Sequence, residues 1–461
     1  MKKAITILLC IILAASLAVL GYLGYQYWYQ QTHVFIEDAV YEKDAASLDL
    51  RGSGISVSHY EQLRAQLPEC EIRWDVPFRE GFVADDAREI TVTALTEADI
   101  QRLDYLTALE TVDATACTDY EMLLALQDHR PEVTVHYQVS IGGEVYDEQT
   151  QKLKFEGEAD IPALVENLPW LPRVQAIQFN EPSVAAEDLV LLKEQFPGIR
   201  VSWYRTLFDT VYDQDTTQLD FSGMVMDEEK LDALAAAMPY FPNLEKVLMV
   251  DCGLENEEMA AFRERVRPYG KVVWAVEVCG TMIRTDETYF MPVKYNIKVT
   301  NNRLSNLVYC EDMLCVDLGH KRVTDISWVS GMPHLKYFIL ADGIIMDISP
   351  ISQLKELIYC ELFYTWCSDF TPLYGCTALQ DLNVSKCYAN IDPTQFGEMP
   401  WLKNLWLSQN TVTQEERAYL AEKLPDTHIY YDGYTPTSGG WRELQNYYDM
   451  RDLLEMPYNP W

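Results

Sequence analysis

The sequence predicts an α/β solenoid that follows an N-terminal transmembrane helix. Three observations indicate this fold class. An apolar pattern, loosely Leu-x-x-Leu-x-Leu, returns in steps of 22, 22, 22 and 23 residues, with copies that begin at Met313, Leu335, Leu357, Leu379 and Leu402. A second mark keeps the same step, an acidic-apolar-hydroxyl triplet that begins at Asp325, Asp347 and Asp369. The third observation is an uncharged apolar run from Ala4 to about Tyr25. Units of this length cannot bury their apolar faces alone, so they must stack on their neighbours.

The first segment, residues 1–31, is expected to be a signal anchor. Lys2 and Lys3 precede the apolar run, and four aromatic residues close it, Tyr25, Tyr27, Trp28 and Tyr29. About twenty residues at 1.5 Å each cross a hydrocarbon core of about 30 Å. Lysines before the run keep the N-terminus inside and send the rest of the chain out. The alternative is a cleaved signal peptide. Both interpretations place the bulk of the chain outside the cytoplasm, and the anchor predicts a single-pass cell-membrane protein.

The charge of the chain argues against one class of partner. Acidic side chains number 71 against 36 basic ones, which gives a formal charge of −35. Nucleic-acid binding depends on clustered lysine and arginine, so we expect no nucleic-acid partner. The 48% apolar content is enough to bury a large core, and the acidic excess suits a solvated extracytoplasmic surface.

The segment after the anchor is expected to contain a stalk and then divergent repeat modules. Residues 32–46 are polar and acidic, and we interpret them as the stalk. Residues 47–282 carry the motif Pro-x-x-x-Ile/Val-x-Trp/Tyr, which starts at Pro68, Pro131, Pro197 and Pro268, with a fifth copy at Pro425. A helix-like segment precedes each proline, which ends the helix, and the following residues alternate as a strand does. Further strands that open the modules begin at Leu48, Ile90, Leu153 and Leu219.

Two features of the middle of the chain lie outside the simple repeat. After one of the motif aromatics, residues 139–147 alternate around Gly142-Gly143, which predicts a hairpin that leaves the solenoid wall. Residues 283–312 break the period and are interpreted as an insert or as the seam between the two halves. Residues 313–433 then form the clear repeats.

The last segment, residues 434–461, is expected to be a linker and an aromatic C-terminal cap. Residues 434–440 are rich in Thr, Pro, Ser and Gly. A partly helical pattern follows, with Trp441, Tyr447, Tyr448, Met450, Leu453, Leu454 and Tyr458. A terminal repeat must cover the open end of the core, which favours a cap. The alternative is a docking peptide that lies on a partner.

The best-preserved copies allow a family resemblance to be stated. Leu335-x-x-Phe338-x-Leu340 has the core pattern of one repeat, and Asn410 follows the copy at Leu402 with Cys387 at the equivalent place one repeat earlier. Residues 313–433 resemble the 22-residue leucine-rich repeats of internalin-like bacterial surface proteins. The resemblance covers about a quarter of the chain. It implies a leucine-rich-repeat-like solenoid, a turn-capping role for Asn410, and a protein-interaction function at a cell envelope.

The cysteines and histidines give no sign of catalysis or metal binding. Eleven cysteines are present; Cys117, Cys252, Cys387 and Cys360 fall at turn or core positions and are expected to be buried thiols. Four others are free to form disulfides in an oxidising compartment, Cys310, Cys315, Cys367 and Cys376. No Cys-x-x-Cys, His-Glu-x-x-His or Gly-x-Ser-x-Gly motif occurs. We therefore predict no catalytic residue, no cofactor and no metal site.

The repeats predict where a ligand would bind. Side chains alternate faces along a strand, so the residues that flank the inner leucines form rows on the concave face of the solenoid. The candidate ligand-binding residues are Asp317, Tyr337, Tyr359, Glu361, Phe363, Asn383 and Trp406. Large aromatics beside an acidic residue suit a protein partner or a sugar-like ligand. Strand propensity, which favours aromatics in any case, is the alternative explanation.

The function that these expectations favour is non-catalytic binding. We expect a membrane-anchored, extracytoplasmic leucine-rich repeat protein that binds a protein partner or a cell-surface ligand. Two alternatives stay open. One is a glycan-acting envelope enzyme with its site at the hairpins or in residues 283–312, and the other is a structural envelope protein that docks through its C-terminal tail.

Overall fold

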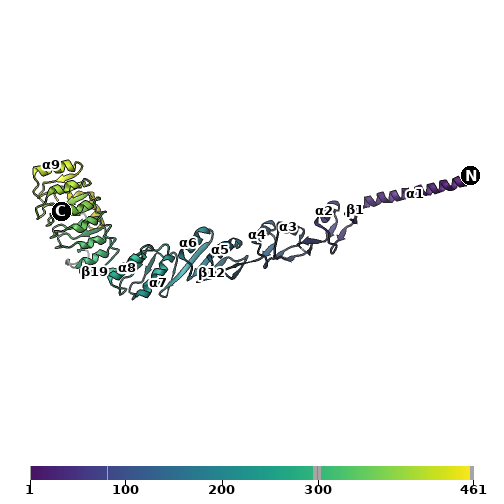
Figure 1. The fold of residues 1–461 in the computed structure, drawn as a ribbon, viewed down its shortest axis with the longest axis horizontal. Helices are drawn as coiled ribbons and strands as arrows, with labels where there is room; N and C mark the ends of the chain where they lie inside the picture. Colours follow the sequence, from purple (N-terminus) through teal and green to yellow (C-terminus); the bar gives the residue numbers. More distant parts are fainter. Residues whose placement is uncertain (1, 80, 294–297, 300–302, 457–461) are drawn as a thin grey trace. The chain divides into compact units, whose positions relative to one another are not determined.

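The computed structural model describes residues 2–79, 81–293, 298–299 and 303–456 (Figure 1). The chain divides into two compact units, Met1–Tyr204 and Arg205–Trp461. The boundary therefore does not fall in residues 283–312, where the sequence suggested a seam. The described part of that segment belongs to the second unit, because Leu304, Leu307 and Cys310 are buried in its core. Residues 294–297 and 300–302 of the segment lie outside the described residues.

The first unit begins with the helix that the sequence predicts. Helix α1 (Lys2–Thr32) has no buried residue. Among the described residues it is the one helix that is long and apolar enough to cross a membrane. Its extent matches the expected segment 1–31 to within one residue at its C-terminal end.

The interpretation of residues 32–46 as a stalk is wrong. Strands β1 (His33–Ile36) and β2 (Ala39–Glu42) form an antiparallel hairpin there. Val34 and Ile36 are almost fully buried and belong to the same apolar cluster as Leu63 of helix α2 (Val57–Gln66). Val34 and Ile36 lie at strand spacing and pack the acidic segment against helix α2. The prediction gave weight to the acidic composition of the segment and not to these two residues.

Modules of alternating strands and helices make up the rest of the first unit. Each module has a small parallel sheet whose strands are joined by helices on one side. The first consists of β3 (Ser47–Asp49), α2 and β4 (Glu71–Arg73). The second consists of β7 (Glu89–Thr91), α3 (Glu97–Arg102), η1 (Leu103–Tyr105), β8 (Thr111–Asp113), α4 (Tyr120–His129) and β9 (Thr134–His136). The third consists of β12 (Lys152–Glu156), α5 (Ile161–Asn167), η2 (Leu168–Trp170), β13 (Ala176–Asn180), α6 (Ala186–Gln195) and β14 (Arg200–Leu207).

In the first unit the aromatic residue of the proline motif joins the first module to the second and the second module to the third. Trp74 is fully buried, and its ring lies 5.6 Å from that of Tyr105 in the following module. Tyr137 is also buried, and its hydroxyl donates to the carbonyl of Trp170, 2.9 Å away in the third module. A large ring at this position therefore fills the space between modules, which explains why the motif ends in Trp or Tyr.

Hairpins follow the first two modules, as residues 139–147 predict. They are β5 (Asp75–Phe78) with β6 (Gly81–Ala84), and β10 (Gln138–Ile141) with β11 (Glu144–Asp147). Gly142 and Gly143 form the second turn with φ of 60° and 90°. Positive φ at both central residues is the geometry that a two-residue hairpin turn requires and that glycine adopts without strain.

The second unit repeats the module plan once before the regular solenoid begins. Its first elements are β15 (Thr210–Asp213), β16 (Gln218–Asp220), α7 (Glu228–Ala237), η3 (Met238–Tyr240), β17 (Lys246–Leu248), α8 (Asn256–Val266) and β18 (Lys271–Val273). The hairpin β19 (Ala275–Val278) and β20 (Thr281–Arg284) follows. The strands predicted to begin at Leu48, Ile90, Leu153 and Leu219 are therefore all present.

A seven-stranded parallel sheet with the order β21 to β27 forms the rest of the second unit. Its strands are β21 (Tyr289–Phe290), β22 (Cys315–Asp317), β23 (Tyr337–Ile339), β24 (Tyr359–Glu361), β25 (Asp381–Asn383), β26 (Asn404–Trp406) and β27 (His428–Tyr430). The connections carry 3₁₀ helices η5 (Ser305–Tyr309), η6 (Ser327–Gly331), η7 (Ser349–Gln353), η8 (Thr371–Gly375) and η9 (Pro393–Glu398), and then α9 (Gln414–Lys423). The tail contains η10 (Trp441–Glu443) and α10 (Gln445–Leu453).

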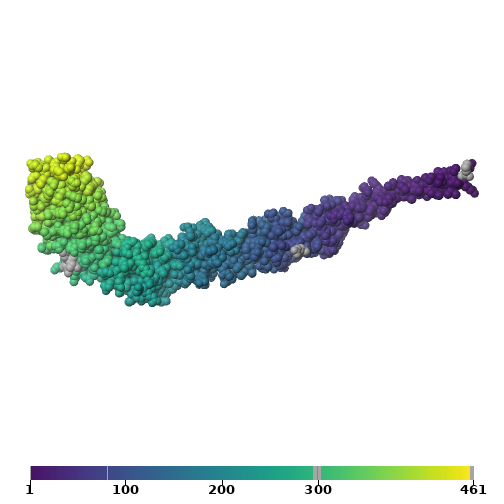
Figure 2. All heavy atoms as spheres, viewed as in Figure 1, coloured from purple at the N-terminus to yellow at the C-terminus, as the bar shows by residue number. Residues whose placement is uncertain are grey.

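The predicted core of these repeats is confirmed. Val316, Phe338, Cys360, Leu382 and Leu405 pair in order from strand to strand. Phe338, Leu340, Leu382 and Leu407 are at most 2% exposed and share one apolar core. In the space-filling view the repeats, green to yellow, fill a continuous block (Figure 2). Stacking of side chains across successive repeats thus holds the second unit together, as the 22-residue step requires.

Asp and Asn side chains form hydrogen bonds with backbone groups at the turns of the repeats. Asp347 Oδ1 accepts the backbone N–H of Ser349 at 2.8 Å, and Asp369 Oδ1 accepts that of Thr371 at 2.9 Å. The backbone hydrogen bond lowers the pKa of Asp347. The pKa of Asp369 is lowered first by the hydroxyl of Thr371, which donates to Asp369 Oδ1 at 2.7 Å, and then by the backbone bond. Asn410 has the role that the resemblance implied: its Oδ1 accepts the N–H of Cys387 at 2.9 Å, and its Nδ2 donates to the carbonyl of Val384 at 2.8 Å.

The turn after each strand also holds a residue in the left-handed region. The residues are His320, Asp342, Tyr364, Lys386 and Gln409, with φ of 60°, 52°, 59°, 47° and 61°. They follow the 22-residue step, so every repeat accepts the same backbone strain.

All eleven cysteines are free thiols, so the disulfides allowed for Cys310, Cys315, Cys367 and Cys376 are not formed. These four are buried instead. Cys376 Sγ donates to the carbonyl of Ile351 at 3.2 Å, and Cys367 Sγ donates to that of Asp369 at 3.3 Å. The structure therefore uses them as small apolar residues with a weak donor, as expected for Cys252, Cys360 and Cys387.

Candidate functional site

The strand register brings the predicted ligand-binding residues onto one face of the seven-stranded sheet. Asp317, Ile339, Glu361, Asn383 and Trp406 pair in order across β22 to β26. Tyr337 pairs with Tyr359 in the row before, and Phe363 belongs to the same apolar cluster as both. The prediction of which side chains share a face is correct.

The prediction that this face is free for a ligand is not supported, because the C-terminal tail covers it. Tyr359 and Asn383 are fully buried, Trp406 is 1% exposed, and Tyr337, Glu361 and Phe363 are also buried. Only Asp317 among the seven candidates is partly exposed. The cluster on this face includes Trp441, Tyr447, Met450 and Leu454 from the tail.

Trp441 is the centre of the covered face. Its side chain is fully buried, and its ring stacks on Tyr359 with centroids 4.9 Å apart. The indole N–H donates to Glu361 Oε1 at 2.7 Å, and the hydroxyl of Tyr359 donates to the same oxygen. A carboxylate that would otherwise be buried without partners therefore receives two donors, one of them from the tail.

Further hydrogen bonds fix the linker and the tail helix. Trp406 Nε1 donates to the carbonyl of Ser438 at 2.7 Å, and Asn383 Nδ2 donates to that of Pro436 at 3.0 Å. Asn446 Nδ2 donates to Asp381 Oδ2 at 2.8 Å. The described part of the tail thus covers the concave face and not the open end of the core. The docking alternative also changes, since residues 441–456 dock on their own chain; residues 457–461, with Tyr458, lie outside the described residues.

The acidic residues of this face are poorly suited to catalysis in this arrangement. Burial raises the pKa of Glu361, although the hydrogen bonds from Trp441 and Tyr359 act in the opposite direction. Burial also raises the pKa of Asp317 and of Asp381. A glycosidase needs two carboxyls that face a shared, solvated substrate. Glu361 and Asp381 are instead hydrogen-bonded to the tail.

An exposed group of side chains lies beside the covered face, at the turns that follow β23, β24 and β25. We name Met346, Tyr364, Trp366, Lys386 and Tyr388 the aromatic edge. Tyr388 lies 5.4 Å from Trp366 and 6.0 Å from Tyr364, ring centroid to ring centroid, and Lys386 Nζ lies 4.8 Å from the centre of the Tyr364 ring. Trp366 and Tyr388 are each 48% exposed, and Met346 is 68% exposed.

Backbone hydrogen bonds hold the aromatic edge in place. Trp366 N–H donates to the carbonyl of Ile345 at 3.1 Å, and Tyr388 N–H donates to that of Thr365 at 2.7 Å. Sequence reasoning missed this surface because it considered only strand residues. The signal was available, since Trp366 and Tyr388 are one repeat step apart and both are large aromatics in a turn.

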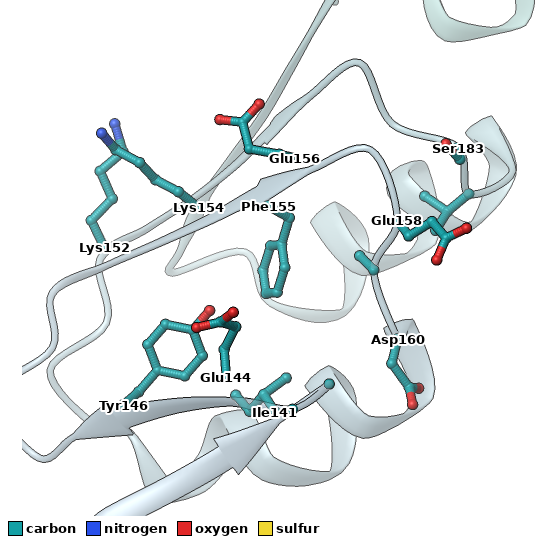
Figure 3. Close-up of a pocket in the computed structure, with 14 residues that line it drawn as sticks. Ile141, Glu144, Tyr146, Lys152, Lys154, Phe155, Glu156, Glu158, Asp160 and Ser183 are labelled. Carbon is teal, nitrogen blue, oxygen red and sulfur yellow. The ribbon is translucent and has the colours of Figure 1, made fainter.

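The first unit contains a cleft of about 1160 Å³ (Figure 3). Strand β12 forms one wall, and the hairpin β10–β11 forms another. The lining combines apolar side chains such as Ile141 and Phe155 with charged ones, Glu144, Lys152, Lys154, Glu156, Glu158 and Asp160. The sequence named the hairpin but gave no reason to expect a cleft beside it.

Metal binding gains no support from the described residues, among which no three His, Cys, Asp or Glu side chains gather as a set of ligands. The spacing Asp213-x-Asp215 is used locally instead: Asp213 Oδ1 accepts the N–H of Asp215 at 3.0 Å.

Comparison with known proteins finds similarity of structure only. No family model matches the chain, and no curated protein sequence matches it. Similar solved structures include internalin C2 of Listeria monocytogenes, with 18% identity, 47% of this chain and 82% of that chain covered, and a TM-score of 0.26. Internalin inlF of the same organism has 16% identity, 83% and 92% coverage, and a TM-score of 0.23. A leucine-rich repeat protein of Leptospira interrogans has 11% identity, 74% and 93% coverage, and a TM-score of 0.25.

The second unit has the fold of a leucine-rich-repeat solenoid. This assignment follows from the register of β21 to β27, the 22-residue step and the cap of Asn410. The first unit keeps the strand–helix plan of such repeats, but its modules form separate small sheets.

Proposed function

We propose that this protein is a membrane-anchored, extracytoplasmic leucine-rich repeat protein that binds a protein partner without catalysis. Helix α1 would be the anchor, and the repeats of the second unit would carry the recognition surface. The concave residues Tyr359, Glu361 and Trp406 would then serve to hold the tail.

The aromatic edge is the observation that carries this proposal. Trp and Tyr dominate the energetics of protein interfaces because a large ring buries much apolar area and loses little conformational entropy. Trp366 and Tyr388 stay about half exposed although they lie on a rigid repeat scaffold, where apolar groups have ample core to enter. A cluster of exposed rings with a neighbouring lysine is typical of a binding surface and unusual for a surface that serves only solubility.

The experiment is a comparison of partner capture. The full chain would be expressed in a bacterial host, cross-linked at the cell surface and purified in detergent. The double variant Trp366→Ala/Tyr388→Ala is expected to lose the partner that the unmodified protein retains, by at least about tenfold, because truncating a hot-spot residue costs about 2 kcal/mol.

The matched control is Tyr434→Ala, which removes a fully exposed tyrosine of the same unit outside the aromatic edge. This variant should retain the partner. Equal capture by the double variant and the unmodified protein would contradict the proposed surface. Extraction of the full chain from membranes by alkaline carbonate would contradict the proposed anchor, since a spanning helix resists that treatment.

A further inference from the structure

The cleft in the first unit lies beside strand β12 and shares no residue with the aromatic edge. Strand β12 is the outermost strand of its sheet and pairs with β13 alone. An unpaired strand edge is a row of free backbone donors and acceptors, which another extended chain can pair with. Whether β12 can accept such a chain depends on which of its backbone groups face away from β13.

Backbone hydrogen bonds between β12 and β13 define which groups of β12 are already paired. The carbonyl of Gln151 accepts the N–H of Ala176, and the N–H of Gly157 donates to the carbonyl of Asn180. In a parallel pair alternate residues direct both their N–H and C=O to the same neighbour. Residues 151, 153, 155 and 157 therefore face β13, and the backbone groups of Lys152, Lys154 and Glu156 face away from it. Those same three residues line the cleft.

Apolar side chains form the floor of the cleft next to this free edge. Phe155 points into it, and Ile141 and Tyr146 lie on the opposite wall (Figure 3). The tip of the hairpin approaches the loop before α5, since a Cβ on Gly142 would lie 3.7 Å from Asp160 Cβ. The space of about 1160 Å³ is large enough for a short extended segment with side chains.

The two lysines of the cleft and two of its carboxylates lie at opposite ends. The amino groups of Lys152 and Lys154 lie together at one end, and Glu158 and Asp160 lie at the other (Figure 3). Lys152 Nζ donates to the neutral Gln178 Oε1, and within the described residues Lys154 forms no ion pair. Two lysines without a carboxylate partner are notable in a chain of formal charge −35.

We propose that this cleft binds an extended segment of a protein partner by strand addition to β12. Cross-strand partners lie on the same face, so alternate residues of the segment stand opposite Lys152, Lys154 and Glu156. The segment that fits carries acidic residues opposite the two lysines and a basic residue opposite Glu156, with small apolar residues between them. Main-chain hydrogen bonds would supply affinity, and the charge order would supply specificity.

The test uses the full chain in detergent and fluorescently labelled, end-blocked peptides. Glu-Val-Glu-Val-Lys matches a parallel strand, and Lys-Val-Glu-Val-Glu matches an antiparallel one. The inverted peptide of each reverses every charge and is Lys-Val-Lys-Val-Glu for the first and Glu-Val-Lys-Val-Lys for the second. One of the two matched peptides is expected to bind at least about tenfold more tightly than its inverted peptide in fluorescence polarisation. N-methylation of its alternate amides should abolish binding, because the strand pairing needs those N–H groups.

The variant Lys154→Glu is expected to weaken the matched peptide at least about tenfold and to strengthen the inverted one. Lys193→Glu, on an exposed position of α6 away from the cleft, is the control with the same charge change and should leave binding unchanged. Circular dichroism would establish that both variants are folded. The proposal is overturned if no matched peptide binds at about 1 mM, if the inverted peptide binds equally well, or if the N-methylated peptide retains its affinity.

Discussion

At the scale of single residues, Trp441 controls how well the concave face is covered. It fills the space over Tyr359 and gives Glu361 a donor. Replacement of Trp441 by Ala is expected to destabilise the second unit by about 3–5 kcal/mol, as for other buried tryptophans. Urea unfolding followed by circular dichroism would measure this loss. Trp366→Ala removes a half-exposed ring from the same unit and should cost about 1 kcal/mol. Equal losses for the two variants would contradict the packing described for Trp441.

The stability of the second unit should depend on pH through the carboxyl of Glu361. Burial raises the pKa of this carboxyl above its usual 4.5, so the folded protein binds the proton more tightly than the unfolded chain. Such a group reduces stability as the pH rises from about 4.5 through the folded-state pKa. Glu361→Gln removes the titration and should therefore gain stability relative to the unmodified protein as the pH rises. Thermal melts between pH 4 and 8 would show this trend. The exposed control Glu422→Gln should show no trend, and a pH-independent effect of Glu361→Gln would exclude the mechanism.

The sequence allowed the face of each strand residue to be predicted, but not its exposure. Alternation along a strand is local, which is why Tyr337, Tyr359 and Trp406 were placed together correctly. Their burial depends on Trp441, which lies 80 positions beyond Glu361. A local sequence pattern contains no information about a contact at that separation. The concave face was therefore predicted to be exposed, although the tail packs against it.

At the scale of elements, the turn cap of Asn410 joins two repeats. It is expected that Asn410→Ala costs about 1–3 kcal/mol, because the N–H of Cys387 and the carbonyl of Val384 lose their partners. The stability of Asn410→Cys should lie between that of the unmodified protein and that of Asn410→Ala, since Cys387 Sγ at the equivalent place donates to the carbonyl of Leu362 in the preceding repeat at 3.9 Å. Chemical denaturation of the three proteins would give the order. The same stability for Ala and Cys would mean that the thiol does not replace the amide.

The elements themselves were largely predictable. Prolines after helices, apolar residues at the 22-residue step and the Gly142-Gly143 turn each act over a few residues, and helices and strands were found where they indicated. The hairpin β1–β2 was missed because few apolar residues mark its inner face in an otherwise acidic segment: Val34 and Ile36 are buried, and Tyr41 is partly buried. The cleft could not be predicted, since it depends on how the hairpin β10–β11 lies against β12.

At the scale of the whole molecule, the core of the solenoid forms one apolar cluster of the second unit, and the tail with the concave face forms another. Deletion of residues 441–461 should therefore leave the repeats folded while exposing the concave aromatics. We expect the melting temperature of the second unit to fall by about 10 °C or more, because several large side chains lose their burial. A synthetic peptide of residues 437–456 should restore part of the loss. An unchanged melting temperature after deletion would show that the tail contributes nothing to the fold.

The division into two units also belongs to this scale and could not be predicted. The proline motif occurs at Pro131, Pro197 and Pro268, on both sides of the boundary between Tyr204 and Arg205. The local chemistry is therefore the same in both units. What differs is whether successive strands pair into one sheet, as β21 to β27 do, or remain in separate sheets.

The left-handed residue of each repeat has a consequence for how this protein can change over time. Glycine would relax the backbone at those five turns, yet the chain places Tyr364 and Lys386 at two of them. Those two side chains belong to the aromatic edge. Substitution of either residue by glycine would relieve backbone strain but would also remove a side chain of the aromatic edge. Selection for stability and selection for binding would therefore oppose each other at these two positions.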